Sequence, residues 1–228
     1  MLRRLLPTQC EVCRRWGRQR LCATCVARHA PAVPRCARCG LRTGQALAEC
    51  GACLHDPPPF AQTVCAVDYA FPWDRLIAQL KFNDHVELAS AMAPLMLAAW
   101  RRDEGARPDV IVPVPLSRRR LAERGYNQAL VLAQPLARDL GRPLLADALE
   151  RVTDSVHQVG STRAQRAANL RAAFMASPRR QAALRDRHVA LVDDVVTTGA
   201  TAAQASSALL RAGAARVDLW ALARTPAD

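Results

Sequence analysis

The sequence has few aromatic side chains and almost no lysine. Phenylalanine, tryptophan and tyrosine make up 4% of its 228 residues, and Lys81 is the single lysine among 32 basic residues. Sparse aromatic residues count against an extended surface on which many bases of a nucleic acid strand stack. Because the chain otherwise uses arginine, this lysine either marks a place that needs a compact ammonium charge or survives by chance at an exposed helix end.

Long apolar runs are also missing. No run approaches the length of a membrane span, and residues 1–7 lack the apolar region of a signal peptide. Half of the residues are hydrophobic, which excludes a disordered chain and predicts a globular protein of one or two domains, expected to be cytoplasmic. The formal charge of +12 would attract polyphosphates or nucleic acid, although many basic proteins bind neither.

Cysteine is concentrated at the N-terminus, where eight of the nine cysteines form four Cys-x-x-Cys pairs. Such a turn points both sulfur atoms at one place, and two turns complete a tetrahedron around zinc. A cytoplasmic chain argues against disulfides, and a redox motif would not occur four times. With four cysteine ligands no position is left for water, so both sites are predicted to be structural. The ligands are Cys10, Cys13, Cys22, Cys25, Cys36, Cys39, Cys50 and Cys53.

Two pairings of these turns are possible. Cross-bracing would join the first turn to the third, whereas sequential pairing closes shorter loops at a lower cost in entropy, so we favour two consecutive zinc ribbons. Ten arginines against one glutamate in residues 1–42 would let this region contact phosphates, an interpretation that stays open. Three prolines at 57–59 form a stiff break, which predicts a double zinc-ribbon domain at 1–59 and a second domain at 60–228.

The second domain is organised around residues 189–201, which read VALVDDVVTTGAT. The apolar run 189–192 predicts a buried parallel strand, with Asp193 and Asp194 leaving the sheet at its end. A loop of small residues follows, and then a helix over 202–211. Backbone N–H groups in such a loop and at a helix start attract an anion, and small side chains let it approach. The loop consists of Thr197, Thr198, Gly199, Ala200 and Thr201.

This loop lacks both the lysine of a Walker phosphate loop and the glycine pattern of a dinucleotide-binding turn. Two adjacent carboxylates ahead of a Thr/Gly loop instead suit a sugar that carries vicinal hydroxyls and a phosphate. The segment resembles the binding motif of the type I phosphoribosyltransferases, which use 5-phosphoribosyl-1-pyrophosphate. The resemblance covers all thirteen positions without a gap.

Apolar and amphipathic segments alternate through the rest of this domain. The alternation predicts an α/β fold with a doubly wound parallel sheet beside the small cysteine-rich domain, and the resemblance implies that this sheet is of the type I phosphoribosyltransferase kind. Strands are expected at 64–69, 109–113, 144–148, 189–192 and 217–223, and helices at 73–82, 86–101, from about 128 to 140, at 161–174 and at 202–211.

A turn rich in arginine follows the predicted strand at 109–113. Pro115, Leu116 and Ser117 form the turn, and Arg118 and Arg124 lie beyond it. A tight turn beside guanidinium groups suits a pyrophosphate. The alternative is a solvated basic face at a helix start, although positive charge there opposes the helix dipole.

Taken together, the four cysteine pairs, the segment 79–82, the VPVP run at 112–115 ahead of 124–128, and residues 192–201 resemble the ComF family over nearly the full length. The resemblance implies a zinc ribbon joined to a phosphoribosyltransferase domain. It also implies a part in DNA uptake during natural transformation, where the family handles incoming single-stranded DNA.

The same resemblance implies roles for individual residues. Asp193 and Asp194 would hold the ribose hydroxyls, residues 197–201 the 5-phosphate, and the turn at 115–117 the pyrophosphate. Further polar positions match the family's loop and the helix after it. These are Arg151, Gln158, Arg166 and Asn169.

If the domain is catalytic, a nitrogen nucleophile displaces pyrophosphate from C1 of the sugar. Mg²⁺ would bridge the pyrophosphate and the sugar hydroxyls, and Arg118, Arg119 or Lys81 would balance the leaving group. Two alternatives are a non-catalytic module that binds single-stranded DNA and retains the phosphate site, and a regulator that senses the sugar pyrophosphate. The fold does not decide among them, and no segment resembles a hood for an acceptor base.

Overall fold

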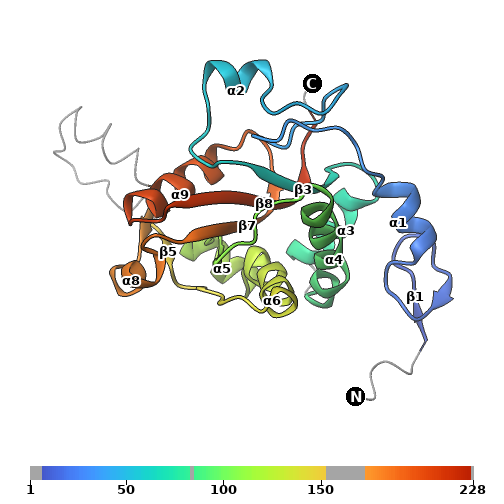
Figure 1. The fold of residues 1–228 in the computed structure, drawn as a ribbon. Helices are drawn as coiled ribbons and strands as arrows, with labels where there is room; N and C mark the ends of the chain where they lie inside the picture. The colour runs from blue at the N-terminus through green and yellow to red at the C-terminus, as the bar shows by residue number, and fades with distance from the viewer. Residues whose placement is uncertain (1–6, 83–84, 153–172, 227–228) are drawn as a thin grey trace.

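A four-stranded parallel sheet in the order β3-β8-β7-β4 forms the centre of the molecule (Figure 1). The computed structural model describes residues 7–82, 85–152 and 173–226. The sheet strands are β3 (Thr63–Asp68), β4 (Val110–Pro113), β7 (His188–Val196) and β8 (Arg216–Arg224), and the main helices are α3 (Trp73–Phe82), α4 (Glu87–Arg102), α6 (Gln128–Leu140) and α9 (Ala200–Arg211).

Helices cover both faces of this sheet. Ala190 and Val192 of β7 belong to the core under α4 and α6, whereas Val189 and Leu191 belong to the core under α9. A strand that is buried on both faces reads as an apolar run, which is why the sequence signals for these strands are short runs of valine, leucine and isoleucine. The predicted α/β fold with a doubly wound parallel sheet is confirmed.

Strand β7 continues past the point where the sequence predicted its end. Its pairing with β4 stops at Val192, opposite Pro113, but its pairing with β8 continues to Val196, opposite Arg224. The prediction that the strand ends at residue 192 is therefore wrong. Because prolines stop β4 and not β7, Asp193 begins the part of β7 that has a neighbour on one side only.

Several smaller elements surround the sheet. The predicted strand at 144–148 is wrong, since only Leu144 bridges to Ile111, and the strand forms later as β5. The predicted helix at 161–174 lies mostly outside the described residues, and its last residue, Phe174, instead opens β6. The smaller elements are α5 (Arg118–Arg124), β5 (Leu149–Arg151), which pairs with β6 (Phe174–Ala176), η2 (Pro178–Arg180) and α8 (Gln181–Leu184).

The N-terminal region divides into two cysteine modules that contact different parts of the sheet domain (Figure 1). The first cysteine module, residues 7–30, lies beside α3 and α4, where Trp73 Nε1 donates to the carbonyl of His29 at 2.6 Å. The second cysteine module, residues 34–56, reaches the edge of the sheet, where the backbone N–H of Thr63 donates to the carbonyl of Ala37 at 2.8 Å. Their elements are β1 (Thr8–Gln9), β2 (Trp16–Gly17), α1 (Ala23–His29) and α2 (Gly51–His55).

The domain division after residue 59 stays a prediction. Within the described ranges, no helix combines the length and the apolar character that crossing a bilayer requires.

Candidate functional site

The acid pair lies at the carboxyl end of β7 and faces a lysine from α3. Lys81 Nζ is 2.9 Å from Asp194 Oδ2, and the two side chains are 20% and 13% exposed. The backbone N–H of Asp194 donates to Asp193 Oδ1 at 2.9 Å, which fixes the first carboxylate against the strand. The fold thus brings the single lysine of the chain to the two carboxylates that the sequence singled out.

Asp193 does not ionise easily in this position. Burial, and after it the charge of Asp194, raises the pKa of Asp193 well above its usual value, while Lys81 and a backbone N–H act in the opposite direction. Burial and the neighbouring carboxylate both disfavour the charged form of Asp193, and a further cation at this place would favour its ionisation.

The loop after β7 is shorter than the sequence predicted. Thr197, Thr198 and Gly199 form it, and α9 begins at Ala200, so Thr201 lies in the first helical turn and not in a loop. Gly199 has a φ of +85°, a conformation that glycine adopts without strain, and the backbone N–H of Ala200 donates to Thr198 Oγ1 at 3.3 Å. The start of α9 therefore directs backbone N–H groups to this edge of the sheet.

Arg224, which the sequence reading missed, lies under this loop. It ends β8, is 8% exposed, and its Nη1 donates to the carbonyl of Val196 at 3.2 Å and to the carbonyl of Thr197. In a trans peptide the N–H of the next residue points away from the carbonyl. The N–H groups of Thr197 and Thr198 are therefore turned away from the guanidinium. An arginine directly after the apolar run 219–223 was the available signal.

The turn after β4 lies at the same edge of the sheet, because β4 and β7 are parallel neighbours. Pro115, Leu116 and Ser117 are half-buried, and Ser117 Oγ accepts from the backbone N–H of Arg120 at 3.3 Å as the cap of α5. Arg118 is exposed at the start of that helix. The predicted turn thus exists beside the acid pair, with basic side chains that reach solvent.

Arg124 supports the end of α3 instead of facing the acid pair. Its guanidinium lies 4.9 Å from the centre of the Phe82 ring, and the Tyr126 hydroxyl donates to the carbonyl of Leu80. Leu80 and Phe82 are the residues on either side of Lys81. Arg124, at the end of α5, and Tyr126 therefore hold the helix end that presents the lysine.

The remaining polar positions are not brought to the site by any contact in the described part of the chain. Arg151 ends β5, where its guanidinium lies 5.4 Å from the centre of the Phe174 ring. Gln158, Arg166 and Asn169 lie outside the described residues, so their roles stay predictions.

The eight N-terminal cysteines form two groups of four, paired sequentially as the sequence favoured. Within each group all sulfur atoms lie within 4.8 Å of one another, with Cys13 and Cys22 at 3.8 Å and Cys39 and Cys50 at 3.8 Å. A zinc–sulfur bond of about 2.3 Å in a tetrahedron places sulfurs about 3.8 Å apart. Both groups therefore fit a tetrahedral metal ion.

Backbone N–H groups already stabilise thiolates in these groups. Burial raises the pKa of Cys10, but N–H groups of Cys13 and Cys22 outweigh it and bring the pKa down to about 6. The backbone N–H of Cys53 lowers the pKa of Cys50 to about 7 against the effect of burial. Thiolate is the form that binds a metal, so each group includes a cysteine that is prepared for one.

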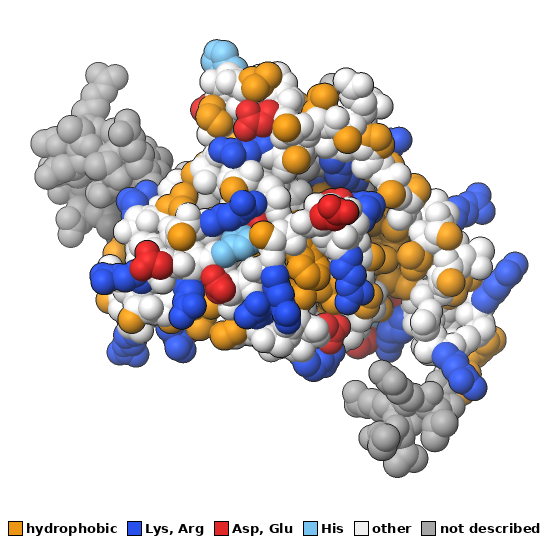
Figure 2. All heavy atoms as spheres, in the orientation of Figure 1, with side chains coloured by type: hydrophobic (Ala, Val, Ile, Leu, Met, Phe, Trp, Pro, Cys, Tyr) orange, Lys and Arg blue, Asp and Glu red, His pale blue; other side chains and the backbone are white. Residues whose placement is uncertain are grey.

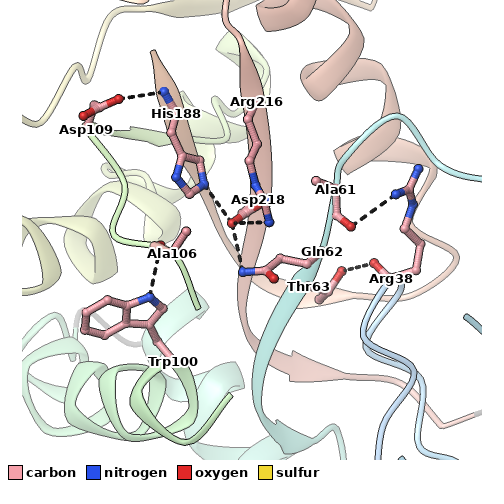
Figure 3. Close-up of polar contacts among 10 residues, drawn as sticks. All are labelled: Arg38, Ala61, Gln62, Thr63, Trp100, Ala106, Asp109, His188, Arg216 and Asp218. Atoms are coloured by element: carbon pink, nitrogen blue, oxygen red, sulfur yellow. Dashed lines mark hydrogen bonds and ion pairs between the residues drawn. The ribbon is translucent and has the colours of Figure 1, made fainter. Parts of the chain in front are cut away.

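A second polar cluster lies at the opposite edge of the sheet (Figure 3). Asp218 is fully buried, and His188 Nε2 lies 2.7 Å and Gln62 Nε2 2.9 Å from its Oδ2, while Arg216 Nε donates to its Oδ1 at 2.8 Å. His188 and Arg216 open β7 and β8, so the cluster joins the amino-terminal ends of the strands. With both of its oxygens bonded inside the protein, Asp218 fastens the sheet.

Basic side chains are spread over the face of the molecule in Figure 2, over the first cysteine module as well as the sheet domain. In that module Trp16 is 70% exposed, with Arg14, Arg15 and Arg18 exposed close to it in the sequence. An exposed indole among guanidinium groups is a feature of surfaces that bind unpaired bases.

The chain is similar to known proteins over most of its length. Residues 89–228 match the phosphoribosyl transferase domain family. The DNA utilization protein YhgH of Salmonella typhi is 39% identical, over 96% of this chain and 98% of that protein. Competence protein F of Haemophilus influenzae is 34% identical, over 90% of each.

Among solved structures, the glutamine phosphoribosylpyrophosphate amidotransferase from B. subtilis aligns with a TM-score of 0.43 and 20% identity. The alignment covers 62% of this chain but only 29% of that one.

Proposed function

The chain belongs to the ComF family of phosphoribosyltransferase-domain proteins, and from that membership we propose that it binds 5-phosphoribosyl-1-pyrophosphate with Mg²⁺ at the carboxyl edge of its sheet. One observation carries the proposal. The acid pair lies on β7 and the small-residue loop follows that strand, while Lys81 Nζ lies 2.9 Å from Asp194 Oδ2. Groups for a sugar's hydroxyls, its phosphate and its pyrophosphate thus lie at one edge.

Each group has a part in this proposal. Asp193 and Asp194 accept hydrogen bonds from the ribose hydroxyls. Backbone N–H groups over residues 197–201 donate to the 5-phosphate. The turn at 115–117, with Arg118 beside it, binds the pyrophosphate.

The acid pair fits a magnesium ion. Carboxylate oxygens are ligands that Mg²⁺ accepts, and a bound cation would offset the burial and the neighbouring charge that raise the pKa of Asp193. Bound with the ligand, the ion supplies charge neutralisation for the pyrophosphate. Lys81 contributes a second positive charge, which belongs to the protein itself.

Where turnover occurs, the reaction class is glycosyl transfer. The C1–O bond breaks with its electron pair on the departing pyrophosphate, and a nitrogen nucleophile forms the new bond to C1. Positive charge develops on the sugar ring, and the carboxylate of Asp194, together with that of Asp193 when it is ionised, stabilises this charge.

We assign structural zinc to the two cysteine groups, since all four ligands in each are thiols at tetrahedral spacing. Metal-bound thiolates suit the reducing cytoplasm, which is where we place the protein.

Calorimetry with the zinc-loaded chain tests the proposal. Phosphoribosyl pyrophosphate with Mg²⁺ should bind the wild-type protein, and Asp194→Asn should weaken that binding at least about tenfold. Asp147→Asn, which removes an exposed acid paired with Arg180, serves as the matched control and should bind as the wild type does. Equal affinity for all three proteins would reject the proposed site.

A second function is favoured by the exposed Trp16 of the first cysteine module and by the relatives, one of which is named a DNA utilization protein. We propose that Trp16 stacks on a base of single-stranded DNA while nearby arginines contact phosphates. In fluorescence anisotropy, Trp16→Ala should weaken oligonucleotide binding about tenfold, with a steep dependence on salt. Unchanged affinity would remove this surface from consideration.

A further inference from the structure

The second cysteine module is fastened closely to the edge of the sheet. Besides the Thr63–Ala37 backbone bond, Thr63 Oγ1 donates to the carbonyl of Arg38 at 2.8 Å, and Arg38 Nη1 donates to the carbonyl of Ala61 at 3.3 Å (Figure 3). Gly40, with a φ of +71°, lies so near that an added Cβ would be 2.8 Å from Thr63 Cγ2. The module therefore cannot shift without moving β3.

Arg224 extends this attachment to the loop of the candidate site. Its Nε donates to the carbonyl of Cys39, a member of the second cysteine group, at 3.2 Å. Its Nη1 donates to the carbonyls of Val196 and Thr197, where the loop begins. One rigid guanidinium thus joins a turn of the second cysteine group to the loop.

The residue opposite Arg224 on β3 is Asp68, whose carboxylate is paired with Arg35 and Arg42 of the second cysteine module instead. None of the ion pairs within the described ranges includes Arg224, and its recorded partners are backbone carbonyls, including that of Thr225 at 3.1 Å. A buried charge is costly unless it is balanced. A zinc ion with four thiolates carries a net charge of about −2, and a phosphate in the loop would also be negative. The guanidinium lies between these two places.

An apolar side chain also approaches the loop from the segment that follows the second module. Phe60, 2% exposed, follows the second module in the chain, and a Cβ placed on Gly199 would be 4.0 Å from its Cζ. The backbone N–H of Ala61 donates to the carbonyl of Val217, so this segment is also tied to β8. The segment that leaves the second module therefore also passes close to the loop, at Phe60.

We propose that Arg224 is a positioning residue through which the metal-loaded second cysteine group holds the loop in its phosphate-binding conformation. The proposal rests on the function proposed above for the loop. Because coupling between two sites is reciprocal, a ligand in the loop must also strengthen metal retention in the second group. The first group provides an internal comparison, since its described hydrogen bonds and ion pairs outside its own module reach α3 and α4 and none reaches residues 193–201.

Metal release from the full-length, zinc-loaded protein tests the coupling. A zinc-selective chelator and a thiol-alkylating reagent are added with or without phosphoribosyl pyrophosphate and Mg²⁺, and mass spectrometry of peptides measures alkylation at Cys36–Cys53 and Cys10–Cys25 separately. The ligand should slow alkylation of the second group about tenfold and that of the first group less than twofold. Equal protection of both groups, or of neither in a protein that binds the ligand, would overturn the proposal.

Two variants separate geometry from charge. Arg224→Lys keeps the charge but cannot span both sets of carbonyls, and Arg224→Gln removes the charge, so each should reduce the selective protection to less than twofold. Arg216→Gln, at the other end of β8, is the matched control and should retain it. Protection that persists in both Arg224 variants would contradict the proposal. Calorimetry that detects no ligand binding to wild type would reject the proposed function and this inference with it, whereas binding without selective protection rejects the inference alone.

Discussion

Each of the two cysteine modules has four cysteine ligands on two Cys-x-x-Cys turns, yet the modules are attached to different parts of the protein. The first contacts the helical layer, at Trp73 on the start of α3 and at Glu87 on α4. The second contacts β3 and, through Arg224, the loop after β7. The same metal chemistry therefore supports two different neighbours, and loss of either metal should have different consequences for the site.

The largest expected effect on ligand affinity comes from replacing a metal ligand. In each module the second cysteine of the first Cys-x-x-Cys turn is changed to serine. Cys39→Ser should lower the affinity for phosphoribosyl pyrophosphate about a hundredfold, because a thiolate lost from the second group releases the loop. Cys13→Ser should change that affinity less than threefold, since the described contacts of the first module reach Trp73 and Glu87 and none reaches the acid pair or the loop. Calorimetry on both zinc-loaded variants measures the two affinities. Equal losses of affinity would show that the second module supports the loop no more than the first does.

The next effect tests the helical side of the site. Lys81→Met should weaken binding about tenfold, or by about 1.4 kcal/mol, because the pyrophosphate loses a cation and Asp194 loses its partner. Arg75→Met removes an exposed charge from the same helix, where the guanidinium lies 5.2 Å from the centre of the Phe71 ring, and should leave affinity unchanged. Equal affinities for the two variants would remove Lys81 from the site.

A smaller effect concerns pH. Because the pKa of Asp193 is raised in the folded protein, its contribution to stability is fully present below the unfolded value of about 3.9 and is lost as the pH rises through the folded value. Asp193→Asn cannot ionise, so at neutral pH it should raise Tm by roughly 3 °C while weakening ligand binding. The difference in Tm should vanish in acid. A Tm difference that does not depend on pH would show that ionisation is not its cause.

The smallest effect tests the attachment of the first module. Trp73→Phe keeps an aromatic ring in the core but removes the pyrrole part of the indole and its hydrogen bond to the His29 carbonyl, which should cost at least about 1 kcal/mol in the free energy of unfolding. Zinc release from the first group should accelerate and that from the second should not. Faster release from both groups would mean that the modules are coupled through the core.

Local patterns in the sequence predicted much of this. The cysteine groups were found because each Cys-x-x-Cys turn is short, and the acid pair and loop because thirteen contiguous residues carry them. Arg224 was missed because its partner Cys39 lies 185 residues away, and no local pattern reports that contact. The end of β7 was wrong for a related reason, since a strand's length depends on whether its neighbours continue.

The most direct test is a crystal structure of the zinc-loaded protein with phosphoribosyl pyrophosphate and Mg²⁺. We predict the 5-phosphate within about 2.7–3.2 Å of backbone nitrogens between Thr197 and Thr201, and the ribose hydroxyls against Asp193 and Asp194. A ligand bound elsewhere, such as on the arginines of the first cysteine module, with the loop empty, would contradict the assignment of this edge of the sheet.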